Sequence, residues 1–438
     1  RRLKMKQLTR LFIPICLETL FYMLSGMVDT LMLSAVGDYA VGAVGTANSY
    51  IGIFIIMFSI ISSGMVSVMT QNIGAGRPGV AYQARQLGLL FNAVAGVLMA
   101  VFLFSGAGAI LRMVGIADAL YEPALIYLKI VGGGCILNAV IPIFSSYLRA
   151  FGYTKQPLYA TIVGNIANFV MNAVFLFVLH KGVAGVAAAT VISKILNLCI
   201  VLYFSHKLIS AKNSTERIAN KTVLGQIVKV GLPSACETAL YNVAMMLVIR
   251  FLNQMDAEGL NVTARSYTAT ISNFSYCVGA ALAQANAIMT GWHIGAGELE
   301  ECDRGTKRAA FVGVCVAVCM ETAIVLGSGF IMPLFTDNPE MTALVRKLLA
   351  IDIVLEIGRV TNLVFGQALK TSGDAVFPAV IAAVFMFVFA VGGTWLFGIS
   401  MGLMAVGAYI GLASDECVRA VGMVWRWKTG KWRTKKLV

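Results

Sequence analysis

Apolar stretches of 20 or more residues follow one another along almost the whole of this 438-residue chain. Each stretch is long enough to cross the hydrocarbon core of a bilayer, which is roughly 30 Å thick. Charged residues make up only 13% of the chain, whereas a soluble domain carries about 25%. We therefore predict an all-α integral membrane protein with no sizeable soluble domain and with twelve spans, at roughly 8–34, 41–70, 86–111, 124–148, 157–180, 183–206, 226–252, 261–290, 308–334, 343–369, 375–399 and 402–427.

The two halves of the chain repeat each other at an offset of about 220 residues. Three motifs recur in register: Pro14-x-x-x-Glu18-Thr19 as Pro233-x-x-x-Glu237-Thr238, Ile73-Gly-Ala-Gly76 as Ile294-Gly-Ala-Gly297, and Leu148, Gly152 and Pro157 as Leu369, Gly373 and Pro378. The duplication predicts two pseudo-symmetric six-helix lobes, at 1–205 and 226–438, joined by a cytoplasmic linker at 206–225. Six is an even number, so the repeats enter the membrane in the same sense and are related by an axis along the membrane normal.

Lys and Arg gather at both ends of the chain and between the halves, while loops after odd-numbered spans hold mainly acidic residues. The positive-inside rule then predicts that both termini and the linker face the cytoplasm. The net charge of +13 is this topological bias and does not indicate nucleic-acid binding. The residues concerned are Arg1, Arg2, Lys4, Lys6 and Arg10; Lys207, Lys212, Arg217, Lys221 and Lys229; Arg426, Lys428, Lys431, Arg433, Lys435 and Lys436; and the acidic Asp38, Asp118, Glu122, Asp256, Glu258 and Asp337.

The sequence lacks the motifs of enzymatic or cofactor-dependent chemistry. Its nine Cys form no CxxC pair, its three His lie near span ends, and it has no HExxH, GxSxG or nucleotide-binding motif. We expect no enzyme activity and no cofactor. Any transport then draws its energy from an ion gradient or from a partner protein.

Polar residues inside the first-half spans are the clearest candidates for function, because a charge in the bilayer is costly and usually faces a cavity or a partner. Asp29 lies in the first span with no Lys or Arg within helical reach, so it either binds a proton or lies against a cation. A purely structural hydrogen bond to a neighbouring helix is the alternative. Asn168 and Asn172 share one helix face with Asn165 close to it; these amides either ligate a hard cation or join helices.

The second half carries a different polar pattern. Asp352, Glu356 and Arg359 form a stripe about 60° wide on the tenth span. With Glu237 they predict a buried salt-bridge network of the second lobe; direct ion or substrate binding is the alternative. We expect Arg419 to pair with Asp415 or Glu416 near the cytoplasmic end while snorkelling. Glu321 stands isolated in the sequence.

Several segments resemble the multidrug and toxic compound extrusion (MATE) transporters of bacteria, in the family's order and over nearly the whole chain. They are IPICLETLFYMLSGMVDTLMLSAVGD, QNIGAGR, YLRAFGYTKQP, GNIANFVMNAVF, GVAGVAAAT, QALKTSGD and DECVRAVGMVWRWKTGKW. The resemblance implies two six-helix lobes forming a V, and export of amphipathic, mostly cationic compounds in exchange for Na⁺ or H⁺. It also implies a monomer in the bacterial inner membrane. A flippase for a lipid-linked substrate is the alternative, and an intramembrane enzyme ranks lower.

The resemblance carries over unevenly to individual residues. The family's first-lobe ion site falls on Asp29, Asn168, Asn172 and Thr190, with Asn172 where an Asp is expected, and the first-span proline that bends that helix is Pro14. In the second half, Tyr241 stands where many members have Glu, and Arg359 falls where they have Asp. Ion coupling, as H⁺ or as Na⁺ at Asp29, is therefore expected in the first lobe.

Overall fold

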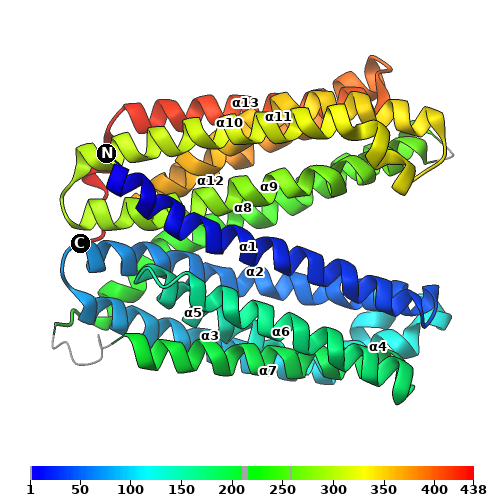
Figure 1. Ribbon diagram of the computed structural model, residues 1–438, viewed down its shortest axis with the longest axis horizontal. Coiled ribbons are helices and arrows are strands. Elements are labelled where there is room, and N and C mark those ends of the chain that lie inside the picture. The colour runs from blue at the N-terminus through cyan, green and yellow to red at the C-terminus, as the bar shows by residue number, and fades with distance from the viewer. Residues whose placement is uncertain (1, 210–215, 257–258) are drawn as a thin grey trace. The chain divides into compact units, whose positions relative to one another are not determined.

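The computed structural model describes residues 2–209, 216–256 and 259–438, nearly all of them helical. Arg1, Lys212 and Glu258, which the orientation prediction used, lie outside the described residues. No strand occurs within the described ranges, and the predicted all-α fold class is confirmed. The chain divides into two compact units, Arg1–Gly231 and Leu232–Val438 (Figure 1).

Helix α8 (Asn220–Met255) runs across the boundary between the units. The other elements of the first unit are α1 (Arg2–Ser34), α2 (Asp38–Gly74), α3 (Pro78–Val114), α4 (Asp118–Gly133), α5 (Cys135–Ala150), α6 (Lys155–Ala173), η1 (Val174–Val178) and α7 (Gly182–Leu208). Those of the second unit are α9 (Leu260–Gly295), α10 (Leu299–Ile331), η3 (Met332–Leu334), α11 (Pro339–Ser372), α12 (Val376–Phe385), η4 (Met386–Val391), η5 (Thr394–Ser400), α13 (Met404–Lys428) and η6 (Lys431–Thr434).

Each predicted span lies on one helix or on one interrupted helix. By length and hydropathy, eight helices of the described chain qualify as spans, and α4 with α5, bent by 42° at the Gly132–Gly134 run, makes a ninth. Helices α9, α11 and α13 have 36, 34 and 25 residues, long enough to cross a bilayer, but they do not meet the same hydropathy and charge limits. Of these three, α11 and α13 carry most of the buried charges of the second unit.

The repeated Gly152 and Gly373 have the same structural role in the two units. Each follows the C-terminus of a helix, α5 and α11, with φ of 85° and 97°. This left-handed conformation disfavours side chains other than Gly. The spans that follow both contain π-helical segments: η1 continues α6, and η4 and η5 continue α12. The duplication is therefore visible in the backbone as well as in the sequence.

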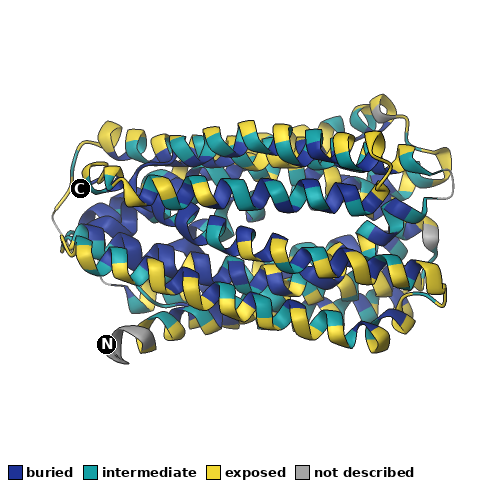
Figure 2. Cartoon of the chain, turned by 90° about the horizontal axis from the view of Figure 1, so that it is seen from above, coloured by how far each residue is buried: buried dark blue, intermediate teal, exposed yellow. Residues whose placement is uncertain are grey.

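Within each unit, helices bury one side and expose the other, as Figure 2 shows. In the first unit α6 packs on α1 and α7, and in the second α11 packs on α9, α10 and α13. Exposed positions carry large apolar side chains, as at Phe311, Leu326 and Phe330 on α10, which are 71%, 72% and 88% exposed. Such a surface matches lipid rather than water. The polar groups collect instead on the sides where helices pack.

Candidate functional site

Asp29 meets the predicted asparagines of α6 in the first unit. The Asn172 amide donates one hydrogen bond to Asp29 Oδ1 at 2.8 Å and a second to Asn168 Oδ1 at 3.1 Å. Both asparagines are buried, and Asp29 is half-buried. The Oδ1 atom of Asn172 is buried with no hydrogen-bond partner in the described part of the chain. The site thus offers a carboxylate and an unpaired amide oxygen, both suited to a proton or a hard cation.

Thr190, the fourth predicted ion-coupling residue, lies on α7 and donates its hydroxyl hydrogen to the carbonyl of Val186 at 2.9 Å. Its connection with the aspartate runs through Tyr127 of α4, a buried side chain that the sequence did not single out. The Tyr127 hydroxyl interacts with Thr190, with Asn48 and with the charge of Asp29. The structure therefore places Thr190 at the edge of the site, where no direct bond to Asp29 is present among the described contacts.

Lys194 is the second residue that the sequence reasoning missed. It lies one turn after Thr190 on α7, and its Nζ donates to Asn138 Oδ1 on α5 at 2.7 Å. It is close enough to Asp29 for the two charges to interact. The prediction that no Lys or Arg lies within helical reach of Asp29 concerned α1 alone, and Lys194 approaches from α7. A Lys inside a predicted span was the signal available in the sequence.

Pro14 lies inside α1, which continues through it. A proline has no N–H, so the carbonyl of Arg10, four residues earlier, loses its helical donor. The Thr154 hydroxyl donates to this carbonyl at 3.4 Å. One turn further along α1, Glu18 forms an ion pair with Arg149 at 2.6 Å. These contacts attach α1 to α5 and to the start of α6.

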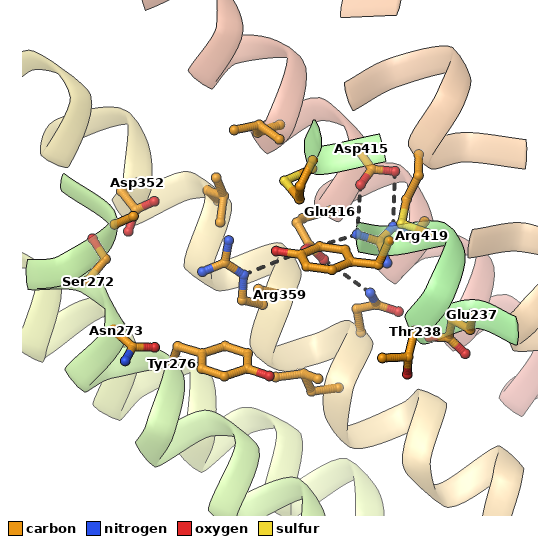
Figure 3. Close-up of a pocket in the computed structure, with 18 of the residues that line it drawn as sticks. Glu237, Thr238, Ser272, Asn273, Tyr276, Asp352, Arg359, Asp415, Glu416 and Arg419 are labelled. Atoms are coloured by element: carbon orange, nitrogen blue, oxygen red, sulfur yellow. Dashed lines mark hydrogen bonds and ion pairs between the residues drawn. The ribbon is translucent and has the colours of Figure 1, made fainter. Parts of the chain in front are cut away.

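A pocket of about 460 Å³ lies within the second unit, between α8, α9, α11 and α13 (Figure 3). Its volume is in the range of small-molecule sites. Four acidic and four basic side chains line it, together with three tyrosines: Glu237, Asp352, Asp415 and Glu416; Arg265, Arg359, Lys370 and Arg419; Tyr241, Tyr276 and Tyr409.

Ion pairs join most of these charges. Arg359 pairs with Glu356, which does not line the pocket itself, as the sequence predicted. Glu416 lies between two guanidinium groups, 3.6 Å from Arg359 and 2.9 Å from Arg419 (Figure 3). Arg419 also donates twice to Asp415, at 3.0 and 2.7 Å. The expectation of snorkelling is therefore wrong: Arg419 is 4% exposed and forms part of the pocket wall.

The remaining acids of the second unit differ in their pairing. Glu237 also lines the pocket, and it pairs with a separate cation, Lys370, at 2.7 Å. Asp352 is 2% exposed, and its Oδ2 has no hydrogen-bond partner within the described ranges. Glu321 is not isolated: its carboxyl group lies close enough to Asp352 and Glu356 for their charges to interact.

Comparison with known proteins identifies the family. The MatE family profile matches residues 14–174 and 233–396, most of the chain and both halves of the duplication. The chain is 32% identical over 428 residues to the uncharacterized transporter YisQ of Bacillus subtilis, covering 96% of this chain and 94% of that one. It is 20% identical to a probable multidrug resistance protein NorM of Thermotoga maritima, over 99% and 94% of the two chains.

Solved structures agree in fold. A crystal structure of a MATE protein in its straight conformation matches with a TM-score of 0.86 at 21% identity, over 98% of this chain and 97% of that one. A MOP superfamily transporter from Pyrococcus furiosus matches with a TM-score of 0.82 at 20% identity, over 98% and 96%. The chain therefore belongs to the MATE family, and it is a membrane transporter rather than an enzyme.

Proposed function

We propose that this protein is a secondary antiporter, which exports amphipathic, mostly cationic organic compounds in exchange for H⁺ or Na⁺ by alternating access. The observation that carries the proposal is the Asp29 carboxylate, which lies inside a membrane-spanning helix and accepts its hydrogen bond from a neutral amide, Asn172. An ionised carboxylate in this setting costs roughly 2.5–3.5 kcal/mol. Binding a proton or a cation removes that cost, so the occupied and empty forms of the site differ in stability.

The Asp29–Asn172 bond gives the bound ion a way to act on the fold. It joins α1 to α6, and Asn165 strengthens the same helix contact by donating to the carbonyl of Phe21 at 2.9 Å. When a proton or ion occupies Asp29, the carboxylate is a weaker acceptor and α1 is released from α6. Each elementary charge that crosses 100 mV supplies about 2.3 kcal/mol, enough for appreciable accumulation of substrate.

Two features of the site bear on the choice between H⁺ and Na⁺. Asn172 replaces the second carboxylate that the family's pattern expects, so the site has lost one negative charge. Lys194 adds a positive charge that interacts with Asp29. The nearby positive charge of Lys194 disfavours a bound proton as well as a bound metal cation, so the lost carboxylate decides the preference: a metal cation needs several anionic or carbonyl oxygens, whereas a single carboxyl group is enough to bind a proton.

The same proposal includes the setting of the transporter. Two six-helix lobes, 1–205 and 226–438, joined by the linker at 206–225, would alternate access for a substrate. The protein would work as a monomer in the bacterial cytoplasmic membrane, with both termini in the cytoplasm. Cysteine labelling of each terminus in intact cells and in inside-out vesicles tests the orientation.

Efflux of a fluorescent organic cation from proteoliposomes tests the function. A pH gradient or a Na⁺ gradient is imposed on the wild type and on Asp29→Asn, with Asp118→Asn, at an exposed helix start, as the matched control. We expect a pH gradient to drive efflux in the wild type and the control, and not in Asp29→Asn. Undiminished coupling in Asp29→Asn would contradict the site. Absence of transport under either gradient, with scrambling of a lipid probe instead, would favour the flippase alternative.

A further inference from the structure

Glu321 is a fully buried carboxyl group that the antiport mechanism above does not use. It lies on α10, it is 0% exposed, and neither of its carboxyl oxygens has a hydrogen-bond partner in the described part of the chain. An ionised carboxylate without a partner in an apolar interior costs several kcal/mol. Such a group survives in a folded protein by binding a proton or by having a function that repays the cost.

The helices packed against α10 bring more acidic groups than basic ones to Glu321. From α11 come Asp352, Glu356 and Arg359, all of which interact with its charge. From α9 comes Ser275, whose buried hydroxyl lies beside it and also lacks a standard hydrogen-bond partner among the described residues. Asp352 Oδ2 and Glu356 Oε2 are buried without a hydrogen-bond partner as well. Glu321 therefore interacts with the charges of two other carboxyl groups and of one guanidinium, and that guanidinium pairs with Glu356.

Among the described residues, Glu321 and Asp352 take no part in the ion pairs of the second unit. The guanidinium groups of the half-buried Arg359 and the buried Arg419 pair with Glu356, Asp415 and Glu416. The pocket's other cations lie elsewhere: Lys370 pairs with Glu237, and Arg265 faces Met245 and Tyr409. Five carboxyl groups thus share two guanidiniums, and protons are the remaining means of neutralising the excess negative charge.

Asp352 connects this buried group with the pocket. Asp352 lines the pocket beside Ser272 of α9 (Figure 3), and its charge interacts with Tyr409 of α13. Glu321 is not among the described residues that line the pocket. We propose that Glu321 and Asp352 form a second proton-carrying site, at which a proton moves between the two carboxyl groups and is exchanged with the pocket. This inference rests on the proposed antiport function. In the transfer, the O–H bond of one carboxyl group breaks, an O–H bond forms on the other, and no other bond changes.

Infrared difference spectroscopy tests the site without any substrate. The carbonyl stretch of a protonated carboxylic acid is recorded across a pH change for the wild type, Glu321→Gln and Glu300→Gln, in detergent-solubilised full-length protein. Glu300 is the matched control, since it lies on the same helix and is exposed. Asp29 and Asp352 also contribute to this spectral region, so we expect one pH-dependent component of the band to be present in the wild type and in Glu300→Gln and to be lost in Glu321→Gln. The same band in all three proteins would overturn the proposal.

Transport measurements then separate a mobile proton from a fixed one. If Glu321 carries one proton per cycle, Glu321→Gln lowers the limiting accumulation of substrate by about tenfold at a pH gradient of about one unit. Asp352→Asn should give the same loss. Unchanged accumulation in Glu321→Gln, with its infrared band lost, would mean a static proton and would overturn the carrier role. Asp29→Asn is measured in the same assay as an independent test of antiport. If pH-driven accumulation is lost in Asp29→Asn but intact in Glu321→Gln, the antiport proposal stands and the second site is refuted.

Discussion

At one pair of equivalent positions, the two units form different polar contacts: a cation with a neutral amide in the first unit, and a cation with a carboxylate in the second. In the first unit, Lys194 of α7 donates to the neutral amide of Asn138 on α5 at 2.7 Å. In the second unit, Arg359 of α11 pairs with Glu416 of α13 at 3.6 Å. The cation has moved to the other helix, and its partner is now a carboxylate. A duplicated scaffold can therefore keep a polar contact between the same two helices while the charges that form it change.

The sequence repeat and one repeated backbone hydrogen bond define which positions are equivalent. Leu148 and Leu369 are matched in the sequence, and the same offset places Asn138 opposite Arg359. For the following helices, the hydrogen bond from Gly185 N to Lys181 O recurs as Gly407 N to Leu403 O, which places Lys194 opposite Glu416. At these two equivalent positions, the first unit has a cation bonded to a neutral amide, and the second has a cation paired directly with a carboxylate. The predictions below test that difference.

The largest effect is expected from removing a cation of the second unit. Arg419→Met leaves Asp415 and Glu416 buried with one fewer partner, which should lower the free energy of unfolding by about 3–5 kcal/mol. Lys194→Met leaves only the neutral Asn138 unpaired and should cost less than half as much. Denaturant unfolding in detergent measures both. Equal losses would show that the two units do not differ in how strongly their charges are coupled.

A smaller effect is expected where α11 and α13 approach closely. A Cβ on Gly358 would lie 2.7 Å from the backbone nitrogen of Cys417, so Gly358→Ala must push α13 away and should cost about 1–3 kcal/mol. The first unit has Leu137 at the equivalent place. Gly366→Ala is the control on the same helix, because its nearest atom would be 3.9 Å away. If Gly358→Ala is as stable as Gly366→Ala, close helix packing does not determine the direct ion pairs.

Restoring a second carboxylate in the first unit should change its ion preference. Asn172→Asp places an acid beside Asp29 and should raise Na⁺ affinity about tenfold, or about 1.4 kcal/mol. The measurement is the shift of the melting temperature with added NaCl, with choline chloride at equal ionic strength as the control. A wild type that responds to Na⁺ as strongly as Asn172→Asp would argue against proton coupling at this site.

The smallest effect concerns the repeated prolines. Thr154→Val removes the bond to Arg10 O and should cost about 0.6 kcal/mol. In the second unit, Ala375 stands opposite Thr154 and has no hydroxyl to offer the carbonyl freed by Pro233. In a Pro14→Ala background, Arg10 O regains a helical donor, and Thr154→Val should have no effect. If Thr154→Val lowers the free energy of unfolding as much in that background as in the wild type, Thr154 acts by packing alone.

The candidate site was predictable only in part. Asp29, Asn168 and Asn172 were singled out because polar groups are rare in apolar spans, and the structure brings them together. The pairing of Glu356 with Arg359 followed from helical spacing and is confirmed. Lys194 and Tyr127 were missed because they reach Asp29 from other helices.

The sequence by itself determined the all-α class, the succession of spans and the duplication. The reason is physical: in a bilayer, backbone polar groups must be satisfied within each helix, so the length and hydropathy of a segment decide its structure locally. Only the tertiary structure decided which charges meet. Asp29 and Asn172 are 143 residues apart, and the helical periodicity of either segment does not show which residue of the other it will meet. Neighbouring charges such as Glu321 and Asp352 depend on how whole helices pack, and the sequence of one helix does not specify its neighbour.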